Sequence, residues 1–162
     1  MRETLGATVQ NNTAKMNKDI VCQIYAGQKS KKTIELVLNN FIPEYNKLNL
    51  DYASPLLNED YIFKNEDEML NYFIEKKGIN QTFYWNQYHN NANRIMVGAI
   101  ITDDDKLIMS LTFDGDKETE TKYFEKLKNI LNSNIGVISY INPVDYENGK
   151  DFIKKYKQNS ST

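Results

Sequence analysis

Apolar and polar residues alternate near the start of the chain, and a helical spacing then replaces the alternation. Ile20, Cys22, Ile24 and Ala26 fall on every second position, which predicts a strand with one buried face that ends at Gly27. Beyond Ser30, a suitable N-cap, apolar residues recur at steps of three and four and predict an amphipathic helix. They are Ile34, Val37, Leu38, Phe41, Ile42, Tyr45 and Leu48. Pro43 lies within this pattern and lacks an N–H, so the helix should end or kink near Phe41.

A connection and a second helix follow. Residues 50–64 combine Pro55 with short apolar pairs and predict a connection with one or two weak strands, for example at 61–64. Asn65 and Glu68 form a capping pair, and Gly78 stands at a typical helix stop. The apolar face between these signals is formed by Met69, Leu70, Phe73 and Ile74. This pattern predicts a helix between Asn65 and Gly78.

The pattern from residue 81 to 113 changes to that of strands. Segments 82–88, 95–102 and 107–113 are rich in aromatic and β-branched residues, and the turn-forming runs HNNAN and DDDK separate them. An antiparallel three-stranded meander is the simplest arrangement. If 82–88 is a strand, Phe83 and Trp85 share one face while Tyr84 and Tyr88 share the other, so one of the two sets should be less buried.

The C-terminal part predicts a helix, a strand and a short helix. Asp116 is the expected N-cap of the first helix, with Glu118 and Glu120 in its first turn. Its core-facing residues would be Tyr123, Phe124, Leu127, Ile130 and Leu131. Residues 136–141 read as a strand that ends before Pro143, and residues 150–156 read as a terminal helix.

This order of elements predicts an α+β fold. We expect a mainly antiparallel sheet with a central three-stranded meander and about three to four helices packed on it, on one side. One domain would span residues 19–157, between a loose N-terminal arm at 1–18 and a disordered tail at 158–162.

Composition narrows the classes of partner. Lys and Arg number 20 against 22 Asp and Glu, a net charge of −2, so counterion release supplies little free energy for binding nucleic acid. The longest apolar stretch, 95–101, is far shorter than the roughly 20 residues of a membrane helix. Residues 1–18 lack the apolar core of a signal peptide, and a single cysteine forms no internal disulfide. We therefore expect a cytoplasmic protein that binds neither nucleic acid nor membrane.

Few side chains suit catalysis. His89 is the only histidine, and Cys22 lies on the apolar face of a strand, where an inert buried thiol is the expected state. The acidic groups at Asp103–Asp105 and at Asp114 and Asp116 resemble oxygen ligands for a metal, but a strand between them would separate the two groups by more than ~20 Å. No phosphate loop, GxSxG or HExxH motif occurs. We therefore expect a protein that is not an enzyme and that binds no metal or cofactor. An enzyme that uses the carboxylates of Asp103–Asp105 is the least favoured of the three functions considered.

Aromatic residues make up 12% of the chain, which has 11 tyrosines. One run of aromatic residues comprises Phe83, Tyr84, Trp85, Tyr88 and His89. Tyrosine and tryptophan are preferred anchors of protein interfaces, and uneven acidic charge steers association with a basic partner. The predicted partner-binding residues are therefore Tyr84, Trp85, Tyr88, His89, Asp103, Asp104, Asp105, Asp114 and Asp116.

The segment VGAIITDDDKLIMSLTFDGDKETETKYFEKLKNIL, followed by NIGVISYINPV, resembles the small immunity proteins of bacterial polymorphic-toxin and contact-dependent inhibition systems. The shared features are a hairpin with an acidic turn, an amphipathic helix and a strand ending at proline. The resemblance implies a cytoplasmic, non-enzymatic inhibitor, monomeric or homodimeric, that binds one cognate toxin, commonly a nuclease, and blocks its active site. The alternative is a small-ligand-binding or sensory domain with a tyrosine-lined pocket.

Overall fold

An antiparallel sheet organises the residues that the computed structural model describes, which are 16–50 and 63–157. Its strands are β1 (Asn17–Gln28), β2 (Gln81–Asn86), β3 (Met96–Ile101), β4 (Lys106–Gly115) and β5 (Gly136–Tyr140). The helices in these ranges are α2 (Lys31–Phe41), α3 (Glu66–Glu75), α4 (Lys117–Leu131) and α5 (Gly149–Tyr156). The predicted α+β class and the central meander are confirmed.

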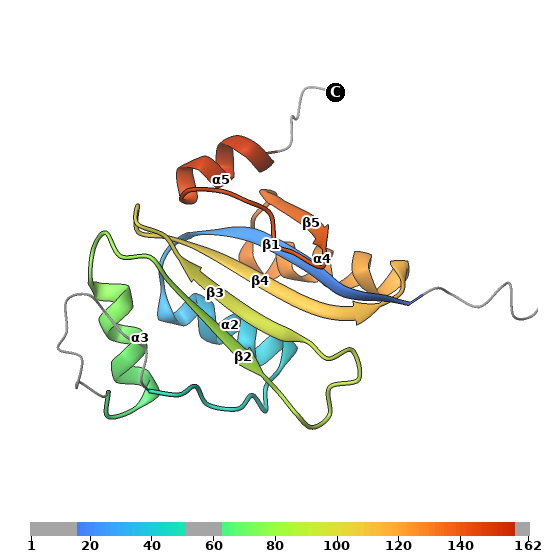
Figure 1. Cartoon of the computed structure of the whole chain (residues 1–162), viewed down its shortest axis with the longest axis horizontal. Coiled ribbons are helices and arrows are strands. Elements are labelled where there is room, and N and C mark those ends of the chain that lie inside the picture. Colours follow the sequence, from blue (N-terminus) through green and yellow to red (C-terminus); the bar gives the residue numbers. More distant parts are fainter. Residues whose placement is uncertain (1–15, 51–62, 158–162) are drawn as a thin grey trace, which may run out of the picture.

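The strand order is β2-β3-β4-β1-β5, and each neighbouring pair is antiparallel. In the sheet, β4 lies between β1 and β3, and β1 lies between β4 and β5. Two split β-α-β units therefore interleave: one runs from β1 through α2 to β3, and the other from β4 through α4 to β5. This is the arrangement of ferredoxin-like folds. The additions to it are α3, then β2 at the outer edge of the sheet, and α5 after β5 (Figure 1).

The predicted helix caps form as the sequence indicates. Each cap side chain accepts a hydrogen bond from the backbone N–H three residues later, which satisfies one of the open donors of the first turn. The pairs are Ser30 with Thr33 (3.3 Å), Asn65 with Glu68 (2.8 Å) and Asp116 with Thr119 (2.8 Å). Helix α2 ends at Phe41, before Pro43, as predicted.

One face of the sheet, called the core face here, is apolar and packs against α2, α3 and α4. Alternate residues of each strand supply it, and the helices cover it with residues such as Ile34, Val37 and Leu127. The strand residues of the core face are Ile20, Cys22, Ile24, Phe83, Trp85, Val97, Ala99, Ile101, Leu107, Met109, Leu111 and Phe113. The predicted burial of one face of β2 is confirmed, since Phe83 and Trp85 are buried while Tyr84 and Tyr88 are exposed.

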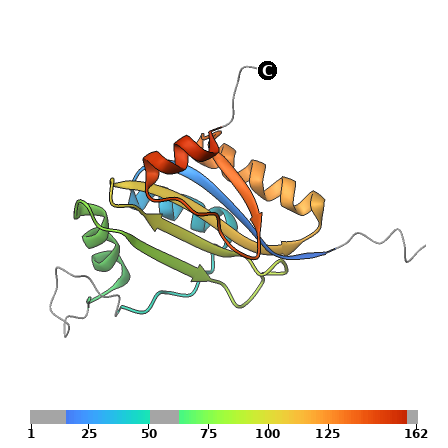
Figure 2. The same cartoon turned by 45° about the horizontal axis from the view of Figure 1, so that its top comes forward.

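The helices do not all lie on one side of the sheet, so that prediction is wrong. Gln23 points away from the core because it alternates with Cys22, and it is hydrogen-bonded to the segment before α5. Figures 1 and 2 both place α5 and this segment on the side opposite α2. Phe152 of α5 packs edge-on against Tyr146 with ring centroids 5.0 Å apart, and so forms a second apolar cluster.

Two boundary predictions also change. Strand β1 begins at Asn17 and continues through Gly27, because the register shifts between Tyr25 and this glycine, whose φ is 85°, and pairing with β4 then resumes at Gly27. Of the weak strand predicted at 61–64, residues 63 and 64 are not in a strand. The rest of that strand, most of the predicted arm and the tail lie outside the described residues. No helix in the described ranges is both long and apolar enough to cross a membrane.

Candidate binding face

The face of the sheet opposite α2 and α4, called the open face here, carries a groove of about 570 Å³. Alternate strand residues form its floor, and the segment 141–147 forms one wall. The floor side chains include Val21, Gln23, Thr82, Tyr84, Met96, Ile100, Ser110 and Thr112. Two smaller hollows adjoin it, one of which lies between Tyr84, Tyr88 and residues 46–49. The open face is therefore mixed in polarity and hollowed.

Hydrogen bonds to β1 hold the wall in place. The backbone N–H of Ile141 donates to the carbonyl of Asp19 (2.8 Å). The Gln23 side chain is buried and uses both ends: its Oε1 accepts from the Val144 N–H (3.0 Å), and its Nε2 donates to the Tyr146 hydroxyl (3.4 Å). A buried amide with both functions satisfied is a rigid link, so the wall is fixed to the sheet.

The acidic turn between β3 and β4 is a structural clamp. Asp104 accepts hydrogen bonds from the backbone N–H groups of Gly149 (2.9 Å) and Lys150 (2.8 Å) and from the Thr102 hydroxyl (2.5 Å). Partial burial alone would raise the pKa of Asp104, but these hydrogen bonds outweigh that effect and lower it below its ordinary value. Asp104 was predicted to meet a partner; instead both of its oxygens hold the start of α5.

Asp105 links the same turn to another part of the fold. Its carboxylate accepts from the Gly78 N–H (3.0 Å) and pairs with the Lys29 ammonium (3.1 Å), and both contacts lower its pKa. Asp103 is exposed, and within the described ranges its carboxylate makes no hydrogen bond or ion pair. Of the three carboxylates that an enzyme at this turn would use, Asp104 and Asp105 are already bound within the fold. Asp103 alone is left for such a role.

Asp114 and Asp116 lie at the other end of β4, so the structure does not bring them to the acidic turn. Asp114 accepts from the Asp19 N–H (3.0 Å), and Asp116 caps α4, whose Thr119 N–H lowers its pKa. Across the described ranges, no three His, Cys, Asp or Glu side chains are placed to hold a metal ion.

The aromatic run divides between the two faces. Tyr84 is 43% exposed and lines the groove, and Tyr88 is 76% exposed beside it. His89 is exposed in the connection from β2 to β3. Trp85 has no exposed surface, so its predicted partner role is corrected: its indole N–H donates to the buried Glu66 carboxylate (2.7 Å).

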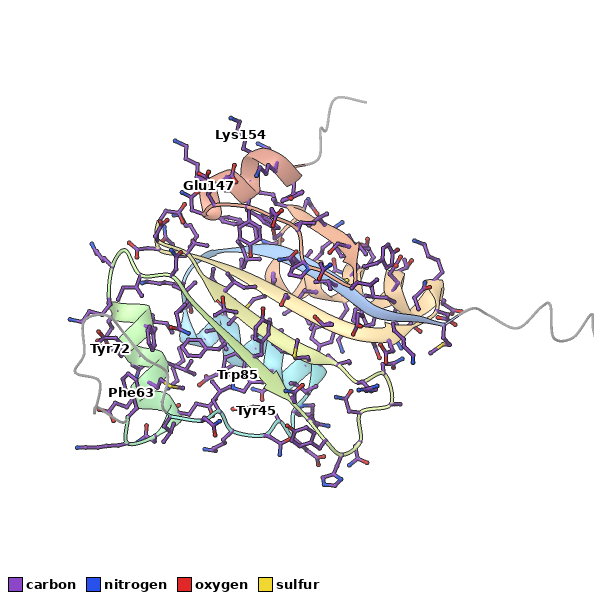
Figure 3. All side chains as sticks on the ribbon, viewed as in Figure 1. Tyr45, Phe63, Tyr72, Trp85, Glu147 and Lys154 are labelled. Atoms are coloured by element: carbon purple, nitrogen blue, oxygen red, sulfur yellow. The ribbon has the colours of Figure 1, made fainter. Side chains whose placement is uncertain are left out.

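The carboxylates at the groove were missed by sequence reasoning. Asp19, Asp145 and Glu147, called the rim carboxylates here, are all exposed and line the groove. Among the described residues that line it, no Lys or Arg occurs. Figure 3 shows Glu147 beside α5 at this rim. The alternation in β1 could have placed Asp19 on the open face, but no local pattern indicates where residues 141–147 lie.

The backbone of the rim is strained. Ile141 has φ of 72° and Asp19, beside it in the ladder, has φ of 55°. The left-handed region is costly for a β-branched side chain, because its Cβ substituents crowd the backbone. Ile141 is also 71% exposed, so burial of its side chain does not offset that cost. Ile141 is therefore a candidate contact residue of the groove.

Two further groups have raised pKa values. Burial, with a smaller effect of the nearby Glu120 carboxylate, raises the pKa of Cys22 to about 12. Burial also raises the pKa of Tyr146 to about 12, and Tyr84 adds to this. Cys22 lies in the core while His89 is exposed, so the structure does not join them as a nucleophile and its base. The Tyr146 hydroxyl stays neutral and available for hydrogen bonding.

Comparison of the chain with protein-family models, with curated proteins and with solved structures finds no match.

Proposed function

We propose that this protein is a cytoplasmic immunity protein that neutralises a toxin by binding it through the groove of the open face. The observation that carries the proposal is the composition of that groove: three exposed carboxylates at its rim, no described cationic residue in its lining, and exposed apolar side chains beside them. The resemblance of residues 97–144 to immunity proteins supplies the class of partner.

Charge complementarity argues for a basic partner. The rim carboxylates stand on two segments, at the start of β1 and in the wall, so their field acts on one groove. Such a surface attracts a cationic partner and repels nucleic acid. A toxin that cleaves nucleic acid needs cationic residues at its active site, and an acidic groove placed over them would exclude its substrate.

Tyr84 and Ile141 are the expected anchors. Each presents a large side chain to solvent at the groove, and each has few side-chain torsions to order on binding. Residues of this kind lose little conformational entropy on binding and bury much apolar area, which is typical of interface hot spots. The central strands β1 and β4 carry Val21, Gln23 and Ser110 on this face, so they lack the aromatic platform of a single-stranded RNA reader.

The test is binding to candidate toxin domains encoded by the genes that neighbour the gene of this chain. The variant Asp19→Asn/Asp145→Asn/Glu147→Gln should bind the cognate domain on the order of tenfold more slowly at low salt, because steering is lost, and the difference should shrink as salt is added. A matched control removes three exposed charges from the helices, in Glu35→Gln/Glu118→Gln/Glu125→Gln. Equal slowing by both variants, or no complex with any neighbouring toxin, would contradict the proposal.

The second candidate is a small-ligand-binding domain. Two tyrosines, Tyr84 and Tyr146, line the groove, and a volume of about 570 Å³ falls within the range of ligand pockets, roughly 300–1,000 Å³. Native mass spectrometry of the purified protein distinguishes the candidates. A retained small molecule that is lost in Tyr84→Ala would favour the ligand-binding domain over the immunity protein.

A further inference from the structure

One row of residues crosses the floor of the groove in register. Tyr84 of β2 pairs with Gly98 of β3, Gly98 with Ser110 of β4, and Ser110 with Gln23 of β1. Tyr146 stands above the far end of the row, where its hydroxyl accepts a hydrogen bond from Gln23 (3.4 Å). The row thus begins and ends at a tyrosine.

Gly98 lets the Tyr84 ring lean onto the sheet. A Cβ atom at this position would lie 2.9 Å from Cε1 of Tyr84 and 2.2 Å from Oγ of Ser110. The absence of a side chain therefore allows the ring to lie close to the backbone, while 43% of the residue stays exposed to solvent. An exposed aromatic ring in this position is a platform for a flat or cationic group.

Ser110 supplies an open acceptor beneath that platform. It is only 4% exposed and faces the groove, yet its hydroxyl has no hydrogen-bond partner among the described residues. Its oxygen opens onto the groove, since no sealed side-chain oxygen among the described residues lacks a partner, so it can accept a hydrogen bond from a ligand there. The rim carboxylates stand around the same groove.

We infer that this row is a subsite for one arginine side chain of the toxin. The inference rests on the proposed function and names what the groove recognises. A guanidinium is planar, stacks on aromatic rings and carries five N–H donors, so it suits a groove that offers the Tyr84 ring, the Ser110 hydroxyl and the rim carboxylates. A lysine ammonium offers no flat face to the ring, and it is more strongly hydrated.

Amide spectra of the labelled full chain test this subsite without the toxin. The probe is Nα-acetyl-L-arginine methylamide, and its citrulline and lysine counterparts are the comparisons. Saturable shifts at Gly98, Ser110 and Gln23 are expected with the arginine probe, with binding of the citrulline probe weaker by roughly tenfold because the charge is absent. No saturable shift at these amides, or equal binding of the citrulline or lysine probe, would overturn the assignment.

Variants locate the site and separate the two proposals. Ser110→Ala should weaken the arginine probe about tenfold and Tyr84→Leu about threefold, whereas Leu36→Ala, at an exposed position of α2 on the opposite side of the sheet, should leave it unchanged. If toxin binding maps to the groove but the arginine probe does not bind, only the subsite assignment fails. If the probe binds as expected but no neighbouring toxin does, the proposed function fails and the subsite stands.

Discussion

Phe83 and Tyr84 are adjacent in β2, yet they belong to surfaces of different kinds. Phe83 faces the core, where it has no exposed surface, while Tyr84 faces the groove and is largely accessible. The same contrast holds along β1, where Cys22 is buried among apolar residues and Gln23 hydrogen-bonds to the groove wall. If the groove binds a partner as proposed, stability and recognition depend on alternate residues of the same strands, and each can be changed by substitution without the other.

The largest expected effect separates the two faces within β2. Phe83→Ala should lower the free energy of unfolding by about 3–5 kcal/mol, because it removes a buried ring and leaves a cavity. Tyr84→Ala should lower it by less than about 1 kcal/mol but should weaken toxin binding, since the ring is exposed. Urea denaturation of both variants measures the contrast. Similar losses of stability would mean that Tyr84 belongs to the structural core after all.

A smaller loss is expected at Glu66, which connects α3 to the core face. Its carboxylate accepts from the Trp85 indole N–H (2.7 Å) and from the Leu48 backbone N–H (3.3 Å). Glu66→Ala leaves both donors without this acceptor and should cost about 1–3 kcal/mol. Glu66→Gln should recover part of that cost, while Glu75→Ala, at an exposed position of the same helix, should be nearly neutral. Tryptophan fluorescence during unfolding checks the ranking.

The attachment of α5 to the open face depends on Asp104 and on pH. Asp104→Ala removes the acceptor of the Gly149 and Lys150 N–H groups and should cost about 1–2 kcal/mol near neutral pH. The pKa of Asp104 is lower in the folded state than its ordinary value of 3.8, so its contribution is complete above that value and disappears as pH falls through the folded pKa.

The difference in stability between the native protein and Asp104→Ala should therefore shrink as pH falls from 7 to below about 3.8. Thermal unfolding across this range measures it, and hydrogen exchange at Gly149 and Lys150 reports the loosening of α5 directly. Asp103→Ala is the matched control in the same turn, since Asp103 is exposed. A difference that stays constant with pH would show that ionised Asp104 does not hold the helix.

Local sequence patterns were sufficient to predict the helices and strands and the residues of the core face. The caps at Ser30, Asn65 and Asp116 are local chemistry, because each side chain serves a backbone N–H three residues away. The alternation in β2 predicted which residues would be buried, since a strand's two faces follow from its period alone. Trp85 shows the limit of composition, because an aromatic residue suits a core as well as an interface.

The groove could not be predicted in the same way, because it is assembled from distant parts of the chain. Gln23 bonds to Val144 and Tyr146, which are 121 and 123 residues away, and no local period specifies that pairing. The acidic turn was misleading for a related reason. Aspartate is common in turns, and only the arrival of α5 shows that Asp104 serves as its anchor.

The smallest expected effect concerns the strained rim and has the opposite sign. Ile141→Asn should raise the free energy of unfolding by roughly 1 kcal/mol, since asparagine tolerates a φ of 72° better than a β-branched residue does. The same change removes an exposed apolar anchor, so toxin affinity should fall while stability rises. Such a trade-off is expected of a residue kept for recognition. Thermal unfolding and calorimetric binding measured on one preparation decide the matter, because a fall in both quantities would place Ile141 with the core face instead.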